Sequence, residues 1–207
     1  MLTLTRQDII NDDLGAFADL RMRLGIGAAC KMNKVFWTAW LAASAAGTFL
    51  TGVRGNLVTS ASLDEAGLNK AVKAFRNALG TDGNLLALEP DRLVVPPDLK
   101  WTAMELLESV YAPDTAAGKT EMRKNVLSGA LDMIVSPYLS DSNDWLLLCT
   151  KRVVKPIIFQ SRVPVEFAAL EASSENGFMR DEYVYGVRAR YNVGYGLWQL
   201  VYGSQVS

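Results

Sequence analysis

The chain has 207 residues, of which 50% are hydrophobic and 21% charged, and its formal net charge is −1. A chain of this length and composition can bury a hydrophobic core, as one large domain or two small ones, and is not a disordered polymer. The near-zero net charge, without a basic tail or a long run of like charges, argues against a dedicated electrostatic nucleic-acid binder.

The chain opens with alternating leucine and threonine and then reaches Ile9 and Ile10. This pattern predicts a strand over residues 1–10 that leads into a long helix. The same residues lack the basic, apolar and small-residue order of a signal peptide, so we expect no export.

The long helix, predicted over about residues 13–46, is called the spine helix below. Its larger apolar side chains recur every three or four residues, which places them on one stripe: Phe17, Leu20, Leu24, Ala28, Met32, Val35 and Ala39. Asn11, Asp12 and Asp13 offer a capping oxygen and negative charge at its start. Roughly thirty residues at 1.5 Å each span about 45 Å, more than a compact domain of this size needs across its own core.

Two features qualify the spine helix. Gly25 and Gly27 lie inside it, and each indicates either a soft point or close approach by another backbone. The helix is not predicted to span a membrane, because charged residues recur as far as Lys34 and the apolar run beyond is well short of about 20 residues.

The middle of the chain alternates helices and strands. A glycine-rich loop over residues 47–60 is followed by a capping box from Ser62 to Glu65, which predicts a helix that Gly80 stops. Arg92–Val95 is predicted to be a short strand, closed by two prolines. The next helix is predicted over about residues 99–111, with its face carried by Trp101, Met104, Leu107 and Val110.

Residues 112–124 are polar and rich in glycine and alanine, so we expect a mobile loop there. The part that follows is predicted to be mostly strand. Short strand-like runs occupy Leu131–Val135, Trp145–Cys149, Pro156–Phe159 and Val163–Ala168, and one or two longer strands occupy Glu182–Tyr202.

The chemical motifs in the chain are weak. Residues 117–120 read Ala-Gly-Lys-Thr, like the end of a phosphate-binding P-loop, but Pro113 replaces the required first glycine and a helix precedes the segment. Residues 25–30 fail the dinucleotide fingerprint because Cys30 replaces its third glycine. The chain has no histidine and only two cysteines, Cys30 and Cys149, which we expect to be buried thiols. We therefore predict no catalytic, cofactor-binding or metal-binding residues.

One group of basic residues leaves two interpretations open. The group comprises Arg123, Lys124, Lys151, Arg152 and Lys155. It can meet phosphate or a carboxylate-bearing neighbouring subunit, or it can be an ordinary solvated face, which is the simpler interpretation.

Several segments taken together resemble a known family. In chain order they are Arg6–Leu14 leading into the long helix, Gly55–Leu57, Leu93–Pro97, Asn125–Leu127 and Val135–Leu139. Their identity, order and spacing resemble the major head subunits of Mu-like tailed phages over nearly the whole chain. That family is similar to the Hong Kong 97-type capsid proteins.

The resemblance implies an α+β Hong Kong 97-type capsid fold with two domains. A peripheral domain would comprise residues 1–55 and 181–207, with the spine helix and a long β-sheet, and a mixed α/β axial domain would comprise residues 56–180. Family members have an N-terminal arm and an extended loop before the segment that begins at Arg6. Because Met1 stands only a few residues ahead of Arg6, we expect the arm and most of that loop to be absent from this chain.

The function implied is that of a major capsid protein that assembles with itself into hexameric and pentameric capsomers of an icosahedral phage head enclosing double-stranded DNA. It would be a structural protein of the virion, assembled in the host bacterial cytoplasm, with weak non-specific contact with packaged DNA at most, no membrane, no cofactor and no enzymatic activity. The candidate subunit contacts are Arg6, Asp12, Asp13, Lys119, Arg123, Lys124, Arg188 and Arg190.

Two alternatives remain. The first is a shell protein of a bacterial nanocompartment with the same fold. The second is a soluble α/β enzyme or ligand-binding domain with its site beyond the Arg92–Val95 strand, where Asp98 and Lys100 would be the groups to test.

Overall fold

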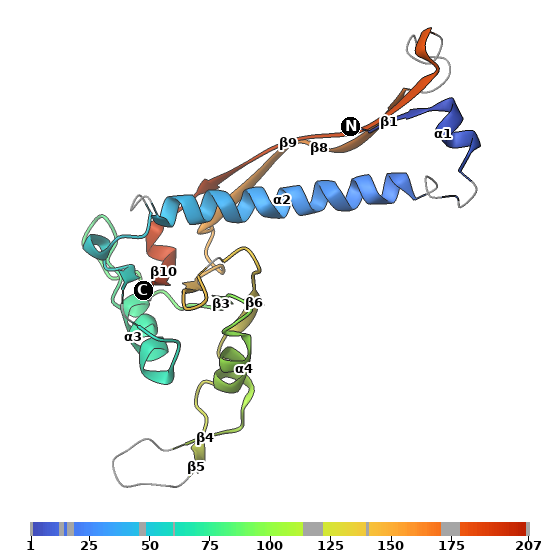
Figure 1. Cartoon of the computed structure of the whole chain (residues 1–207). Helices are drawn as coiled ribbons and strands as arrows, with labels where there is room; N and C mark the ends of the chain where they lie inside the picture. Colours follow the sequence, from blue (N-terminus) through green and yellow to red (C-terminus); the bar gives the residue numbers. More distant parts are fainter. Residues whose placement is uncertain are drawn as a thin grey trace. The chain divides into compact units, whose positions relative to one another are not determined.

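A computed structural model describes residues 2–12, 15, 19–45, 49–59, 61–113, 122–139, 141–170 and 179–205. The chain divides into two compact units. Unit 1 comprises Met1–Phe36 and Phe159–Gly194, and unit 2 comprises Trp37–Ile158 and Tyr195–Ser207. Each unit is described by itself below (Figure 1).

Unit 1 begins with strand β1, Leu2–Thr5, and a short helix α1, Arg6–Ile10. The predicted strand over residues 1–10 is therefore wrong after Thr5. The reason is a capping box, in which the Thr5 hydroxyl accepts from the Asp8 backbone N–H and the Asp8 carboxylate accepts from the Thr5 backbone N–H. The hydrogen bonds from Thr5 also lower the pKa of Asp8 below its ordinary value.

The spine helix is α2, Leu20–Ala45, and it is the longest helix in Figure 1. The predicted start near residue 13 is wrong, and Asn11 caps the end of α1 instead of the start of the spine helix. Gly15 has a φ of 63°, a left-handed conformation that no regular helix continues through. The predicted stripe is confirmed where side chains are described, because Leu24, Ala28 and Met32 are half-buried while their neighbours on the other faces are exposed.

The sheet of unit 1 has the strand order β1-β9-β8. Strand β8 is Ile157–Leu170 and strand β9 is Glu182–Tyr195. The two short strands predicted within residues 156–168 are thus a single long strand, in which polar residues 160–162 continue the ladder. Strand β1 pairs antiparallel with β9, with Leu2 opposite Tyr185 and Thr5 opposite Glu182.

Unit 2 contains a five-stranded sheet of order β2-β10-β7-β3-β6. The strands are β2 Leu57–Val58, β3 Arg92–Val95, β6 Asp132–Val135, β7 Trp145–Leu148 and β10 Val201–Ser204. Pairs β3–β6 and β10–β2 are parallel, whereas β7 pairs antiparallel with both β3 and β10. The mixed order places β10 between β2 and β7, so that it is an interior strand of the sheet.

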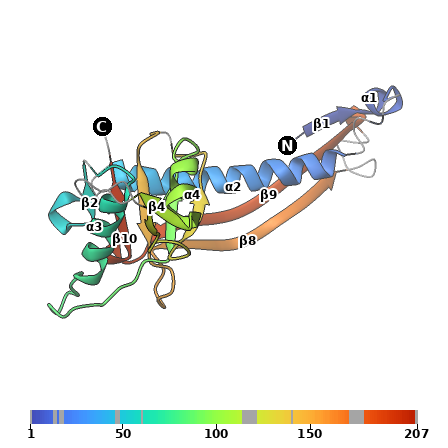
Figure 2. The ribbon, with the colours of Figure 1, turned by 90° about the horizontal axis from the view of Figure 1, so that it is seen from below.

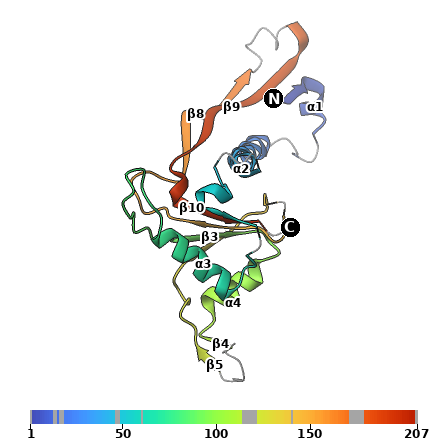
Figure 3. The same cartoon turned by 90° about the vertical axis from the view of Figure 1, so that its left-hand side faces the viewer.

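Helices α3, Glu65–Arg76, and α4, Lys100–Glu108, lie on the same face of this sheet (Figure 3). Short 3-10 turns, η1 Gly52–Arg54 and η2 Trp198–Leu200, precede β2 and β10. A hairpin of β4, Tyr111–Pro113, and β5, Met122–Lys124, follows α4. The predicted loop over residues 112–124 therefore begins and ends in paired strands, and the rest of it lies outside the described residues.

The core of unit 2 explains why its central strands are apolar throughout. Leu93, Val95, Trp145 and Leu147 pack in one cluster with α3 and α4. The alternate residues Val94, Leu146 and Leu148 pack in a second cluster with Phe49 and Leu50 on the other face. Because successive side chains of a strand point to opposite faces, a strand covered on both sides needs a continuous apolar run.

The N-terminus of α3 corrects one predicted detail. The cap is Asp64, whose carboxylate accepts from the Gly67 backbone N–H at 2.6 Å, and Ser62 lies outside the helix. Both residues offer a capping oxygen in the sequence, but only Asp64 stands directly before Glu65, the first helical residue.

This cap leads to a testable difference between two neighbouring substitutions. Asp64→Ala is expected to lower the free energy of unfolding by about 1 kcal/mol, because the Gly67 N–H loses its acceptor and the helix dipole loses a negative charge. Ser62→Ala is the matched control, and its effect should stay within about 0.5 kcal/mol because the Ser62 side chain is exposed. Urea denaturation followed by circular dichroism measures both, and equal losses would contradict the assignment of the cap.

Candidate subunit-contact surfaces

The three predicted contact arginines of unit 1 are exposed, and two of them already hold partners within the chain. Arg6 lies 3.9 Å from the Asp181 carboxylate, and the Arg188 guanidinium lies 2.8 Å from the Glu166 carboxylate. Arg190 is exposed near the middle of β9. The pairs are too solvated to add much stability, since exposed ion pairs are worth under about 1 kcal/mol.

The remaining predicted contact residues are Asp12, Asp13, Lys119, Arg123 and Lys124, and the structure describes three of them. Arg123 on β5 pairs with Glu65 at the start of α3, so its charge is engaged within unit 2. Lys124 is exposed. Asp12 is half-buried in the turn after α1, while Asp13 and Lys119 lie outside the described residues.

The two residues predicted for the enzyme or ligand-binding alternative lie at the surface. Asp98 and Lys100 are both exposed, and the Lys100 ammonium lies 5.7 Å from the centroid of the adjacent Trp101 ring. Gly25 and Gly27 lie within α2, and residues 117–120 are outside the described part. Among the described residues, no group of three or more histidine, cysteine, aspartate or glutamate side chains is arranged to hold a metal ion. Within the same ranges, no helix is both long and apolar enough to cross a membrane.

The glycines of the spine helix have open space beside them. A Cβ atom built at Gly25 or Gly27 would meet nothing within 4 Å among the described residues. The close backbone approach that would require glycine at these positions therefore does not occur within the described part of this chain. Cys30, on the same helix, is exposed rather than buried as predicted, because the spine helix packs along one stripe only.

Basic side chains of unit 2 line a cavity of about 590 Å³ between the end of α3 and the loop after β7. Arg76 pairs with Glu89 at 2.9 Å, and Arg152 donates to the carbonyl oxygens of Leu86 and Ala87. Cys149 lies at this cavity, where burial raises the pKa of its thiol. The predicted basic group is thus divided, since Arg123 lies at the hairpin and Lys151 and Arg152 lie here.

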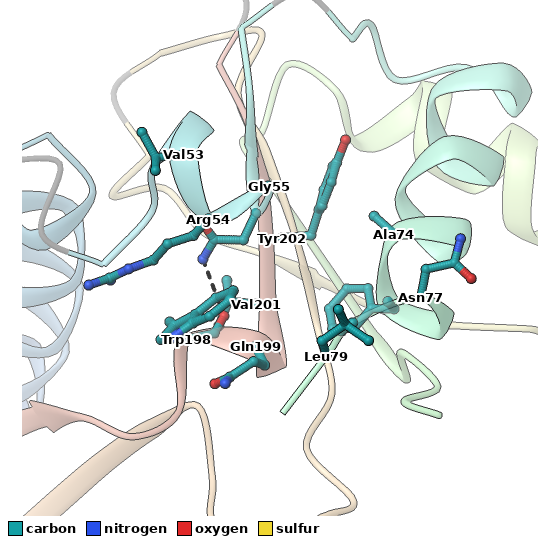
Figure 4. A pocket seen from close by; sticks show the side chains of 13 residues that line it. Val53, Arg54, Gly55, Ala74, Asn77, Leu79, Trp198, Gln199, Val201 and Tyr202 are labelled. Atoms are coloured by element: carbon teal, nitrogen blue, oxygen red, sulfur yellow. Dashed lines mark hydrogen bonds between the residues drawn. The ribbon is translucent and has the colours of Figure 1, made fainter. Parts of the chain in front are cut away.

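A second cavity of unit 2, of about 500 Å³, is largely apolar. It lies where η1, the end of α3 and η2 meet, and Figure 4 shows the side chains of Leu79, Trp198 and Tyr202 around it. We call it the η cavity. Burial raises the pKa of the Tyr202 hydroxyl, which makes the uncharged form more dominant.

Buried Asn56 holds the η cavity together. Its side-chain oxygen accepts from the Thr51 N–H at 3.0 Å, and its side-chain nitrogen donates to the carbonyl oxygens of Phe49 and Trp198 at 3.0 and 3.2 Å. The Arg54 guanidinium lies 5.6 Å from the centroid of the Trp198 ring, at the rim. No local sequence pattern indicates this cavity, because its walls come from segments more than a hundred residues apart.

Exposed apolar side chains are the other feature that the sequence did not reveal. Trp101 is 73% exposed at the start of α4, although it was predicted to face the core of that helix, and Val53 is 100% exposed on η1. Tyr111, Met122 and Val126, around the hairpin, are 62%, 70% and 80% exposed. Aromatic and methionine side chains are enriched at protein interfaces, and Lys and Glu are depleted there.

Comparison with known proteins relates this chain to phage capsid proteins. A family model described as phage capsid protein matches residues 1–202. The Mu-like prophage FluMu major head subunit of Haemophilus influenzae is 43% identical over 68 residues, which are 32% of this chain and 22% of that protein. The matched segment thus spans less than a quarter of the length of that relative.

Solved structures show the same fold at low sequence identity. The capsid structure of the cyanophage P-SCSP1u has a TM-score of 0.60 at 11% identity, with 100% of this chain and 70% of that chain covered. The SrpI encapsulin complex of Synechococcus elongatus PCC 7942 has a TM-score of 0.54 at 10% identity, with 98% and 70% covered. With a family match over nearly its whole length and these structural neighbours, the chain belongs to the phage capsid protein family and has the α+β Hong Kong 97-type capsid fold that its sequence predicted.

Proposed function

We propose that this protein is the major capsid protein of a phage head. It assembles with itself into hexameric and pentameric capsomers of an icosahedral shell that encloses double-stranded DNA, and it works through contacts rather than catalysis. The observation that carries the proposal is the family match over residues 1–202. The 43% identity with a segment of a Mu-like prophage major head subunit supports it.

The surface of unit 1 supports self-assembly on physical grounds. The stripe of α2 that includes Leu24 and Ala28 is half-buried, yet Met22 and Ile26 on other faces are 65% and 57% exposed. A helix that is apolar on several sides is usually buried on several sides. Additional copies of the chain supply the missing cover in a shell.

The two compact units correspond in this proposal to the two domains of the fold. Unit 1, with the spine helix as far as Phe36 and the β1-β9-β8 sheet, serves as the peripheral domain. Unit 2, with the five-stranded sheet and the β4–β5 hairpin, serves as the axial domain around each capsomer centre. The compact units end at Phe36, Ile158 and Gly194. The domain boundaries predicted from the sequence, at residues 55 and 180, stay a prediction.

Electron microscopy of the purified 207-residue chain tests the proposal, together with sedimentation velocity over a range of protein concentrations. Capsomers, sheets or closed shells are expected. A protein that stays strictly monomeric at high concentration, with a folded circular dichroism spectrum, would count against it.

A nanocompartment shell is the second candidate, because the encapsulin complex matches this fold almost as well as the cyanophage capsid does, with TM-scores of 0.54 and 0.60. The two candidates differ in cargo. Particles recovered from the native source would hold double-stranded DNA if they are phage heads and protein cargo if they are nanocompartments. Contact with DNA should be weak and salt-sensitive, since the net charge of the chain is −1.

Reversing the charge of two lysines in the β4–β5 hairpin and its loop tests whether this region contacts adjacent subunits in a capsomer. Lys119→Glu with Lys124→Glu should leave the monomer folded and weaken capsomers, because we propose that these lysines meet acidic or carbonyl groups of adjacent subunits. Each exposed pair is worth under about 1 kcal/mol, but the ring repeats it. Arg123 is left unchanged because its substitution would also break the pair with Glu65.

Light scattering at low salt measures this assembly, and Lys70→Glu, a change at an exposed residue of α3, is the matched control. If the double variant assembles as readily as the parent, the loop faces solvent and takes no part in the capsomer.

A further inference from the structure

We propose that Trp101 of one copy inserts into the η cavity of the next copy. The inference rests on the proposed self-assembly and adds to it a specific contact between two parts of unit 2. Two observations carry it. The Trp101 side chain is 73% exposed, and the η cavity on the same unit has a volume of about 500 Å³.

The exposure of Trp101 is costly for a protein that acts alone. Tryptophan is among the largest apolar side chains, and it is the residue type most enriched at the energetic centres of interfaces. Trp101 is the second residue of helix α4, and the buried face of that helix carries Ala103 and Leu107 instead. The side chain is therefore presented from a rigid element.

The η cavity has the chemistry to receive an aromatic ring. Leu79, Trp198 and Val201 contribute apolar walls. The volume of the cavity falls within the range of ligand pockets, which is roughly 300–1,000 Å³. Val53, 100% exposed at the rim, gains cover when a neighbour docks there. The described lining residues include no carboxylate.

The position of the two features favours a ring over a two-fold dimer. The η cavity lies near the edge of the sheet that β2 and β10 form, whereas α4, which carries Trp101, packs against β6 at the other edge. Figure 2 shows β2 and β10 away from α4. Four strand spacings of about 4.8 Å separate the two edges by about 19 Å. Because the two surfaces differ, the contact is head-to-tail, and such contacts close into rings when the rotation between copies permits.

Charge complementarity sets the orientation of the contact. Asp98 is exposed three residues before Trp101, and Arg54 lies at the rim of the η cavity over Trp198. Insertion of Trp101 brings this carboxylate toward that guanidinium, and it requires the Lys100 ammonium to leave the Trp101 ring. A pair at the rim contributes little affinity, but it favours one orientation and disfavours others.

Disulfide trapping tests the contact directly. In a Cys30→Ser background, which removes the exposed native thiol, Val53→Cys and Asp98→Cys are made as two separate proteins and mixed under mild oxidation. The mixture should yield disulfide-linked dimers, and neither protein alone should. Val153→Cys, 99% exposed on the loop after β7, is the matched control and should not link to either. Linkage of Asp98→Cys to itself would overturn the head-to-tail contact.

Assembly of Trp101 variants tests the energetic claim. Trp101→Ala should raise the concentration needed for assembly by at least about 30-fold, as for an interface hot spot, and Trp101→Phe should recover part of the loss. Val153→Ala, at an exposed apolar residue on the loop after β7, should assemble like the parent. If the parent assembles and Trp101→Ala assembles equally well, this inference fails while the proposed function stands. If the folded parent does not assemble at all, the proposed function fails with it.

Discussion

Trp145→Ala is expected to lower the free energy of unfolding of unit 2 by about 3–5 kcal/mol. The Trp145 side chain is 0% exposed, packs between the β-sheet and the helices in the larger core cluster, and lies 6.1 Å from the Tyr202 ring, centroid to centroid. Its removal leaves a cavity that the surrounding strands cannot collapse to fill, because they are fixed by pairing on both sides of β7.

The hydrogen bond of Trp145 adds less to this loss than the cavity does. The indole N–H donates to the Ala61 carbonyl oxygen at 2.9 Å, but the Ser204 hydroxyl donates to the same oxygen at 2.6 Å. The carbonyl therefore keeps a partner when the indole is removed.

Two variants control the measurement, which is urea denaturation followed by circular dichroism. Trp145→Phe retains most of the apolar volume and should lose less stability. Trp101→Ala removes the same side chain from an exposed position and should change the stability of the isolated chain by no more than about 0.5 kcal/mol. Equal losses for Trp145→Ala and Trp101→Ala would mean that the burial assigned to these two tryptophans is wrong.

Asp91→Ala is expected to cost about 2–4 kcal/mol, the second largest effect. Asp91 is 7% exposed, and its carboxylate accepts from both the backbone N–H and the hydroxyl of Thr150. Its main chain joins neighbouring strands, since its N–H donates to the Leu148 carbonyl and its own carbonyl accepts from the Asp132 N–H. Alanine keeps the main-chain bonds but leaves the Thr150 donors without their charged acceptor.

Asp91→Asn is the matched control for this position. The amide oxygen can still accept from the Thr150 N–H, and the threonine hydroxyl can reverse its role and accept from the amide nitrogen. The loss should therefore be smaller than for alanine. Thr150→Val, alone and combined with Asp91→Ala, completes a double-mutant cycle, and additive losses would show that the two side chains do not interact.

The two tryptophans show where sequence reasoning stops. Both stand in apolar patterns, Trp145 before three leucines and Trp101 in a helical period with Leu107. The strand at Trp145 is covered on both faces, so every side chain in it is buried, as its continuous apolar run indicated. In α4 only the face that carries Ala103 and Leu107 is buried, and the period alone does not reveal that Trp101 falls outside it.

The sequence by itself determined the elements whose local pattern has one solution: the half-buried stripe of the spine helix, the apolar strands β3 and β7, and membership of a capsid family through motifs spread along the chain. Tertiary structure decided which of two capping residues begins α3, that residues 157–170 form one strand, and that the η cavity exists. These three features depend on competition between neighbouring residues or on contacts between segments far apart in the chain. The hydrogen bond between Asn56 and Trp198 is one such contact, and no local sequence pattern indicates it. Apart from proline, local propensities differ by about 1 kcal/mol or less, so contacts of that strength or more between distant segments make the choice.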